Sequence, residues 1–318
     1  MIFTLSDTDT RQIAKKLVTI REAHGQATTG RVLTLIVVAD PNDDIEAISG
    51  ATADASREHP SRVLVMVPVA DEADKPSLDA EIRVGGHAGA TEMVLMTVRG
   101  GATNHLAAVV TPLLLPDTPI VAWWPSTAPK DLASDPIGRL AQRRITDCQH
   151  TGATLPLQIR RDNYAPGDSD MAWSRITPWR GVVASTLDQP PHDEISSAAV
   201  WGPAGNPSVC LAAGWLADRF GLPVTRHNID GPSVPVDDDG NELPPIHKLV
   251  LERNCGAITV VVTDHQTLTV TNNATGRSSL VPLNRRSVAD CLTEEMRHLA
   301  PDNAYAKALR ALGRVTQQ

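Results

Sequence analysis

The chain has 318 residues, of which 42% are hydrophobic and 21% are charged, a composition typical of a globular protein with room for about two domains. Its formal net charge of -8 at pH 7 argues against a nucleic-acid partner, because contacts to phosphates need a basic surface. The sequence shows no apolar run of transmembrane length and no secretory signal, and its four cysteines are far apart. We therefore expect a cytoplasmic protein with reduced thiols and no membrane partner.

The first half of the sequence alternates amphipathic segments with buried, β-branched segments. The run RVLTLIVVAD at 31–40 is almost continuously apolar, as in a strand covered on both faces. The expected elements, in chain order, are a helix over 10–24, a strand over 31–40, a helix over 43–58, strands over 62–69, 80–85 and 91–98, a helix over 103–114 and a strand over 119–123. This alternation predicts a doubly wound α/β domain with a mostly parallel sheet.

The middle of the chain is rich in proline and arginine. A helix is expected over 136–144, and helices are expected within 168–189, where Thr177 caps a new helix that has Pro178 at its first position. A run of arginines between 139 and 161 has only one acidic residue within it. Such a run either forms a solvated face paired with acids elsewhere, or binds a phosphate or an acidic partner. The run consists of Arg139, Arg143, Arg144, Arg160 and Arg161.

The last part of the sequence predicts a second, smaller α/β (α+β) domain. Its short apolar segments between 246 and 283 favour an antiparallel meander. The other expected elements are a strand over 197–204, a helix over 206–221 that ends at Gly221, a strand within 222–228, and closing helices over 287–299 and 302–313. We place the N-terminal α/β domain at 1–168 and the C-terminal domain at 169–318.

Two adjacent tryptophans, Trp123 and Trp124, end the predicted strand PIVAWW and precede Pro125. Adjacent side chains on a strand point to opposite faces of the sheet. One indole is therefore expected in the core, and the other toward the crevice at the carboxyl ends of the strands, the second domain or a partner. Three roles remain open for the tryptophans: core or domain-interface packing, partner docking, and a small-molecule pocket.

A second group of aromatic and basic residues lies in MAWSRITPWR. Trp173 and Trp179 flank Arg175, and Arg180 follows directly. Trp and Arg are over-represented at interaction hot spots, which favours a contact surface. A single tryptophan in a helix is more often a core residue, so both interpretations remain open.

No set of catalytic or metal-ligating residues can be assembled from the sequence. The ten histidines have no metal-binding spacing, and the G-x-S-x-G motif is absent. Gly100, Gly101 and Thr103 follow a strand and open a predicted helix, so they form either a tight turn or a weak anion-binding site. They do not match the glycine patterns of nucleotide sites. We expect no catalytic residue, no metal and no cofactor.

Several segments resemble the OpcA family of glucose-6-phosphate dehydrogenase assembly proteins, which occurs in actinobacteria and cyanobacteria. The segments follow the family order, cover nearly the whole chain and are most similar to the actinobacterial branch. They are GRVLTLIVVAD (30–40), ASREHPSRVLV (55–65), TPIVAWWPSTAP (118–129), DPIGRLAQRRITD (135–147), MAWSRITPWR (171–180) and LTEEMRHLAPDNAYAKAL (292–309).

The resemblance implies a non-catalytic protein that binds glucose-6-phosphate dehydrogenase and promotes its assembly and activity in the oxidative pentose phosphate pathway. Such a binder acts by shifting the dehydrogenase toward its active state. The alternative is an enzyme or metabolite sensor that binds a sugar phosphate. The residues that match family motifs and have the chemistry of a partner contact are Trp123, Trp124, Pro125, Arg143, Arg144, Trp173, Arg175, Pro178, Trp179 and Arg180.

Overall fold

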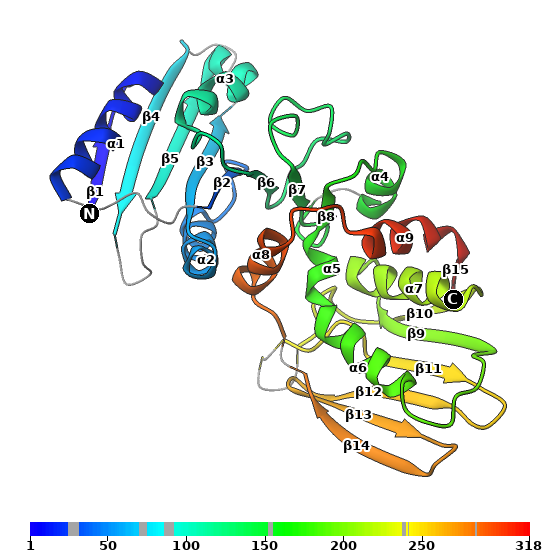
Figure 1. Cartoon of the computed structure of the whole chain (residues 1–318). Helices are drawn as coiled ribbons and strands as arrows, with labels where there is room; N and C mark the ends of the chain where they lie inside the picture. The colour runs from blue at the N-terminus through cyan, green and yellow to red at the C-terminus, as the bar shows by residue number, and fades with distance from the viewer. Residues whose placement is uncertain are drawn as a thin grey trace. The chain divides into compact units, whose positions relative to one another are not determined.

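The computed structural model describes residues 1–24, 32–69, 75–85, 92–151, 155–236, 240, 242–283 and 285–318 (Figure 1). The chain forms two compact units, each assembled from three segments. Unit 1 comprises Met1–Thr154, Asn163–Met171 and Val288–Pro301, and unit 2 comprises Leu155–Asp162, Ala172–Ser287 and Asp302–Gln318. Because the chain passes between the units several times, the expected division at residue 168 stays a prediction about sequence domains.

Unit 1 is built on an eight-stranded sheet with the order β1-β4-β5-β3-β2-β6-β7-β8. Neighbouring strands from β5 to β8 run parallel, whereas β4 is antiparallel to β5 and β1 is antiparallel to β4. The strands are β1 (Ile2–Leu5), β2 (Leu33–Val38), β3 (Ser61–Val69), β4 (Ser77–Val84), β5 (Glu92–Arg99), β6 (Ile120–Trp124), β7 (Arg143–Thr146) and β8 (Asp168–Asp170). The expected mostly parallel sheet is confirmed.

The parallel part of this sheet has the strand order of a doubly wound nucleotide-binding fold. The chain starts at β2, moves outward through β3 to β5, and then returns to β6 on the other side of β2. Written by order of appearance, β5-β3-β2-β6-β7-β8 is 3-2-1-4-5-6. The strand order therefore reverses between β2 and β6, and ligands of such folds bind outside the carboxyl ends of the strands at that point.

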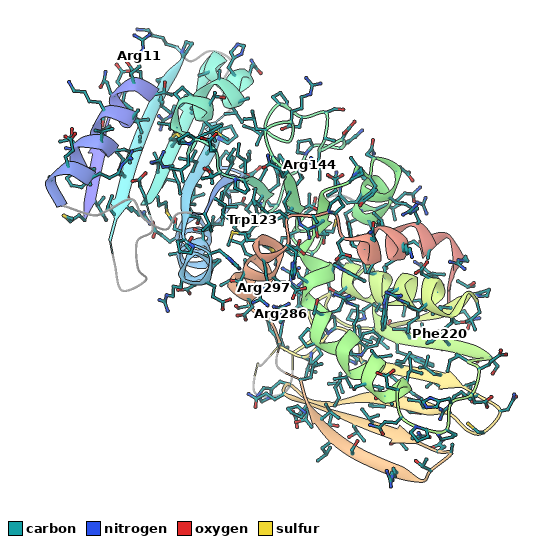
Figure 2. The ribbon with its side chains drawn as sticks, viewed as in Figure 1. Arg11, Trp123, Arg144, Phe220, Arg286 and Arg297 are labelled. Carbon is teal, nitrogen blue, oxygen red and sulfur yellow. The ribbon has the colours of Figure 1, made fainter. Side chains whose placement is uncertain are left out.

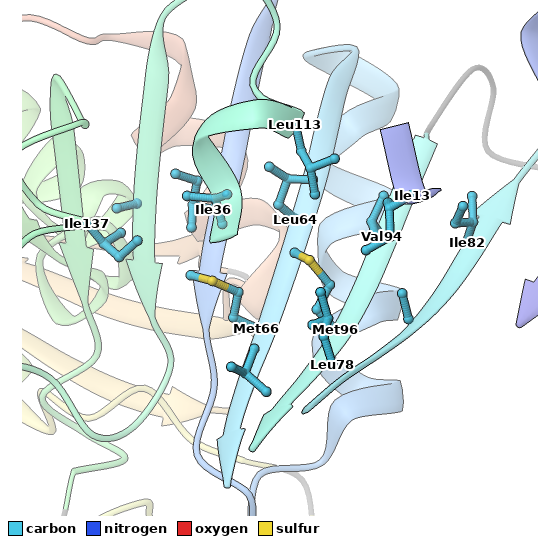
Figure 3. Packing of buried hydrophobic residues seen from close by; sticks show 14 of the residues in the cluster. Ile13, Ile36, Leu64, Met66, Leu78, Ile82, Val94, Met96, Leu113 and Ile137 are labelled. Atoms are coloured by element: carbon cyan, nitrogen blue, oxygen red, sulfur yellow. The ribbon is translucent and has the colours of Figure 1, made fainter. Parts of the chain in front are cut away.

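The two faces of the sheet in unit 1 carry separate hydrophobic clusters. One face packs against α1 (Thr10–His24), where Ile13 and Leu17 are fully buried, and against α3 (Leu106–Val110). Figure 3 shows this cluster, with Ile36, Leu64 and Met66 on the strands. The opposite face packs against α2 (Ile45–Glu58) and α8 (Val288–Arg297). Burial on both faces explains why the strands read as continuous apolar runs.

Unit 2 is built on a seven-stranded sheet with the order β14-β13-β12-β11-β9-β10-β15. The strands β11 to β14 form an antiparallel meander, and β9, β10 and β15 run parallel to their neighbours. The expected meander is thereby confirmed. The strands are β9 (Ser197–Pro203), β10 (Val224–Ile229), β11 (Lys248–Glu252), β12 (Ile258–Asp264), β13 (Thr267–Asn272), β14 (Arg277–Pro282) and β15 (Val315–Gln317).

The helices of unit 2 begin and end at recognisable cap residues. Asn206 accepts hydrogen bonds from the first backbone amides of α7, and Gly221 ends that helix with a positive φ of 72°. The expected start of a new helix at the Thr-Pro pair is confirmed, although its N-cap is Ile176 and not Thr177. The helices are α4 (Pro156–Asp162), α5 (Met171–Arg175, at the passage from unit 1), α6 (Thr177–Leu187), α7 (Pro207–Phe220) and α9 (Asn303–Ala311).

Two expected helices in unit 1 are not formed as predicted. The segment over 103–114 is divided into a 3-10 turn, the short α3 and another 3-10 turn that contains Pro112, which has no amide hydrogen for a regular helix. The helix expected over 136–144 is wrong. There Asp135 accepts bonds from the amides of Ile137 and Gly138, and a Cβ on Gly138 would lie 1.7 Å from the carbonyl oxygen of Leu132.

Buried arginines join strands of unit 1 to segments that come later in the chain. Arg143 on β7 donates from two side-chain nitrogens to Glu295 on α8, and both residues are at most 4% exposed at their side chains. A third nitrogen donates to the carbonyl oxygen of Ala300 at 3.3 Å. Burial raises the pKa of the Glu295 carboxyl, and the Arg143 guanidinium opposes that shift. The pair therefore fixes α8 on one face of the sheet.

Replacement of Glu295 by Gln is expected to lower the free energy of unfolding by about 3–5 kcal/mol, because Arg143 would keep a buried charge without a partner. The matched control in the same unit is Glu58→Gln, which removes the surface pair of Glu58 with Arg297, whose side chains are 61% and 57% exposed. The control should cost under about 1 kcal/mol. Urea unfolding measures both values, and equal losses would contradict a structural role for the buried pair.

Candidate functional site

A crevice of about 450 Å³ opens where the strand order of unit 1 reverses. It lies at the carboxyl ends of β2, β3 and β6 and beside the turn that follows β5. The lining residues are Val38, Ala39, Asp40, Pro41, Pro68, Thr103, Asn104, Leu106, Trp124, Thr127, Ala128, Pro129, Asp135, Pro136 and Ile137. The described lining thus combines apolar walls with carboxylates, and none of these residues is basic.

The loop between β2 and α2 fills the place where a nucleotide phosphate would bind. In folds with this strand order, glycines in the first turn let the backbone approach the phosphates. Here the turn reads ADPNDD and contains no glycine. The Asp43 carboxylate accepts hydrogen bonds from the Asp40 amide at 2.8 Å and from the Ser126 hydroxyl at 2.9 Å. These bonds tie the loops after β2 and β6 to each other.

The amino end of α2 is already occupied by acidic side chains of the protein itself. Asp44 is the N-cap and accepts a bond from the Ala47 amide at 3.0 Å. Glu46 follows in the first turn, and a hydrogen bond from Arg83 lowers the pKa of its carboxyl. A helix amino end attracts anions through its free amides. Because carboxylates already take that role here, a bound phosphate would meet several negative charges.

The predicted anion site at Gly100, Gly101 and Thr103 lies on the wall of the crevice. These residues belong to a 3-10 turn, and Gly100 has a positive φ of 58°. The Thr103 hydroxyl donates to the carbonyl oxygen of Gly100 at 2.8 Å. The following α3 has only five residues. The segment forms the tight turn that was one of its two expected roles, and its anion binding stays a prediction.

Trp123 and Trp124 point to opposite faces of the sheet, as their places in the two separate clusters show. Each is 2% exposed. Trp123 packs in the cluster that α2 and α8 cover, and Figure 2 marks its position. Its Nε1 atom is buried without a hydrogen-bond partner. Trp124 packs in the other cluster and also borders the crevice. The expected two-sided arrangement is confirmed, whereas contact of either residue or Pro125 with a partner stays a prediction.

The predicted basic residues of unit 1 are held in ion pairs. Arg144, labelled in Figure 2, binds the Asp168 carboxylate on β8 at 2.5 Å, and the carbonyl oxygens of Ala141 and Pro166. It is 7% exposed, and Arg143 is 3% exposed. Both guanidinium groups thus serve the packing of β7 against its neighbours. Their role as partner contacts stays a prediction.

The predicted aromatic residues of unit 2 lie in its helical layer. Trp173 donates from Nε1 to the Asp302 carboxylate at 2.8 Å, and the Arg180 guanidinium lies 3.6 Å from the centre of the Trp173 ring. Trp179 meets Trp215 of α7 edge to face, with ring centres 6.1 Å apart. Trp173 and Trp179 are at most 3% exposed. Arg175, Pro178 and Arg180 are half-buried.

The sequence reasoning missed the acidic turn after β2. Asp40, Asp43 and Asp44 follow a buried strand directly, and the carboxyl end of such a strand is where ligand loops lie. The signal was therefore present in the spacing ADPNDD. Its meaning depends on β2 being the first strand of the parallel series, which requires the strand order.

Comparison with known protein families gives a clear result. Residues 52–161 match the glucose-6-phosphate dehydrogenase subunit N-terminal domain of the OpcA family, and residues 166–309 match the corresponding C-terminal domain. The chain belongs to the OpcA family. The resemblance seen in the sequence segments is thereby confirmed, and the family descriptions associate the chain with glucose-6-phosphate dehydrogenase.

A relative of this OpcA-family chain occurs in Synechocystis sp., where it is named as a candidate OxPP cycle protein, OpcA. The two are 24% identical over 200 residues, which are 56% of this chain and 40% of the relative. The chain thus matches less than half of the length of that relative.

Two solved structures show a distant likeness to the chain. A levoglucosan dehydrogenase in complex with NADH and L-sorbose has a TM-score of 0.39 at 10% identity, over 90% of this chain and 91% of its own. A structure described as trehalose-6-phosphate from E. coli bound with UDP-2-fluoro glucose has a TM-score of 0.25 at 10% identity, over 61% and 64%. Both scores are too low to carry an argument about function.

Two further findings concern the described part of this OpcA-family chain. Within the described ranges, no helix is long and apolar enough to cross a membrane. A search of the same residues finds no group of three or more His, Cys, Asp or Glu side chains that could hold a metal ion.

Trp124→Ala is expected to lower the free energy of unfolding by about 3–5 kcal/mol, because the indole is buried in the larger cluster of unit 1. Val18→Ala on α1 is the control, since Val18 is 46% exposed, and it should change stability by about 0.5 kcal/mol or less. Denaturant unfolding measures both. A Trp124 variant of normal stability that binds the dehydrogenase poorly would instead identify a contact residue.

Nucleotides and sugar phosphates are expected to leave the melting temperature unchanged, because the acidic turn after β2 repels their phosphates. A ligand at a hundredfold its dissociation constant stabilises a protein by about 2.7 kcal/mol, which a thermal-shift assay detects. NADP, ATP and glucose 6-phosphate should each be tested. A shift that Asp43→Asn increases would show that a phosphate does enter the crevice against the charge of the loop.

Proposed function

We propose that the chain is a non-catalytic cytoplasmic partner of glucose-6-phosphate dehydrogenase that promotes the active state of that enzyme in the oxidative pentose phosphate pathway. The observation that carries the proposal is the match of residues 52–161 and 166–309 to the two domains of one dehydrogenase-subunit family. A binder changes the activity of its partner only through a difference in affinity for two states of that partner. The mechanism is therefore a shift of the dehydrogenase toward the state that binds more tightly.

The crevice of unit 1 supports a role without nucleotide chemistry. Its described lining contains no histidine, lysine, arginine or cysteine, and the carboxylates of Asp40 and Asp43 are engaged in hydrogen bonds of the loop. The fold has the strand order of a dinucleotide-binding domain, while the residues at its phosphate position have the opposite charge preference. This combination favours a scaffold that has kept the architecture and serves a partner.

The alternative, a sugar-phosphate enzyme or sensor, receives less support from the arginines that suggested it. Arg143 and Arg144 are paired with Glu295 and Asp168. A bound phosphate would have to displace these carboxylates from buried positions, which is costly because the carboxylates would lose their partners.

Stoichiometric addition of the protein is expected to raise the turnover of the dehydrogenase or to lower its apparent KM for glucose 6-phosphate. Coupling between two binding events commonly changes affinity by about 5- to 150-fold. Steady-state assays with and without the protein, together with the mass of the dehydrogenase oligomer by light scattering, measure the effect. Unchanged kinetics and an unchanged oligomer would refute the proposal.

A reciprocal measurement provides the control. If the protein tightens glucose 6-phosphate binding by some factor, glucose 6-phosphate must tighten binding of the protein by the same factor. Calorimetric titrations with and without the substrate compare the two numbers. The protein alone, with NADP and glucose 6-phosphate, should produce no NADPH, and turnover by the purified protein would contradict a non-catalytic role.

A further inference from the structure

One face of the seven-stranded sheet in unit 2 carries two rows of side chains that cross the whole sheet. The register of the strands aligns each residue with its partner on the next strand. The first row is Thr316, Thr225, Ala199, Val250, Thr259, Thr271 and Ser278. The second row is His227, Trp201, Lys248, Val261, Thr269 and Leu280. These 13 residues (7 in the first row and 6 in the second) are called the outer sheet face below.

The outer sheet face is accessible, while the alternate residues on the same strands are buried. Burial alternates residue by residue along β9, β11 and β13, as it does in a sheet with one covered face. The helices lie on the covered side, where a Cβ on Gly202 would meet the Val209 side chain of α7 at 2.5 Å. None of the residues in the two rows is buried, and Leu280 is 68% exposed.

The composition of the outer sheet face differs from that of an ordinary solvated sheet face. Lys248 is the one residue in the two rows with a fixed charge, in a chain of which 21% is charged. Glu252 and Asp264 stand at strand ends beyond the rows. The centres of protein interfaces are depleted in charged residues and enriched in aromatic ones. Threonine, valine and alanine, which make up most of the face, form a surface that loses little hydration when covered.

Trp201 stands at the middle of this face in a fixed orientation. Its ring stacks on the His227 imidazole, with centres 4.4 Å apart and planes 13° apart. On the other side, Lys248 Nζ lies 4.9 Å from the centre of the indole. Because β10 and β11 flank β9, the two neighbours hold the ring from both sides. A tryptophan that is rigid before binding is a favourable anchor, since little side-chain entropy is lost.

The size of the outer sheet face suits a protein partner. Seven strands about 4.8 Å apart extend across roughly 29 Å, and strand segments of about six residues are roughly 20 Å long. The product, roughly 600 Å², approaches the roughly 800 Å² that each side of a standard interface buries. The flat shape favours another folded surface over a small molecule.

We propose that the outer sheet face docks glucose-6-phosphate dehydrogenase through a flat, mostly uncharged patch that presents a carboxylate to Lys248. The inference rests on the proposed function and adds the surface that performs it. A second copy of this chain fits less well, because the two rows contain no carboxylate. Two identical faces would therefore bury two ammonium groups without partners inside the rows, which is unfavourable.

The test introduces a lysine into the centre of the face. Thr259→Lys on β12 adds a second positive charge beside Val250 and Val261 and should weaken binding of the dehydrogenase by about tenfold or more in isothermal titration calorimetry. Ala184→Lys, at an exposed position on α6, carries the same change on the helical side and should bind within about twofold of the original protein. Equal melting temperatures of the two variants show that folding is intact.

A second pair of variants covers the case in which Thr259→Lys does not fold. Leu280→Lys lies on the edge strand β14 and should also weaken binding, while Lys248→Glu should weaken it and reduce its dependence on salt. If the original protein binds the dehydrogenase and all three variants bind equally well, the docking surface is refuted and the proposed function stands. If the original protein does not bind, both proposals fail. If the variants abolish only self-association in sedimentation experiments, the face belongs to a second copy and the inference is overturned.

Discussion

The buried ion pair between Arg143 on β7 and Glu295 on α8 joins positions 152 residues apart. Glu295 is one of the few carboxylates of unit 1 that no water reaches, and Arg143 satisfies it with two nitrogens. Such a pair contributes little net stability compared with apolar residues, but it tolerates no other partner. It fixes which helix covers the Trp123 side of the sheet, and the hydrophobic packing of Leu292 and Met296 then follows.

The crevice of unit 1 shows how one architecture can lose a function while its packing persists. The apolar strands and their order depend on burial, and burial is indifferent to the loop that follows β2. In that loop, aspartates replace the backbone room that a phosphate needs, and they bind Ser126 and Thr127 of the neighbouring loop instead. The loops are thereby fixed to each other by side chains that belong to the chain itself.

Sequence periodicity predicted the strands that are buried on both faces, because β2, β3, β5 and β6 consist of apolar runs that fit no other structure. It did not predict β7 and β8, whose sequences RRIT and DSD are charged. Those residues become strands because Arg144 and Asp168 find each other in the fold. Long-range pairing of this kind leaves no local pattern. The same limit explains the helix wrongly expected over 136–144.

The candidate sites show the same division between local and distant information. Neighbouring tryptophans at the end of β6 had to face opposite ways, because a strand alternates its side chains. That both are almost fully buried depends on α1, α2 and α8, which come from distant parts of the chain. The outer sheet face of unit 2 is visible only when seven strands are aligned, since no single strand carries more than two of its residues in the rows.

The position of α8 in unit 1 has a consequence for synthesis of the protein. Val288–Pro301 belongs to unit 1, although the ribosome makes it after almost all of unit 2. Until then, the sheet face around Trp123 lacks Cys291, Leu292 and Met296 and stays uncovered during translation. Exposed apolar surface on a nascent chain is a site for chaperones and for aggregation. Unit 1 therefore begins first and finishes late, so its folding depends on how quickly the ribosome completes unit 2.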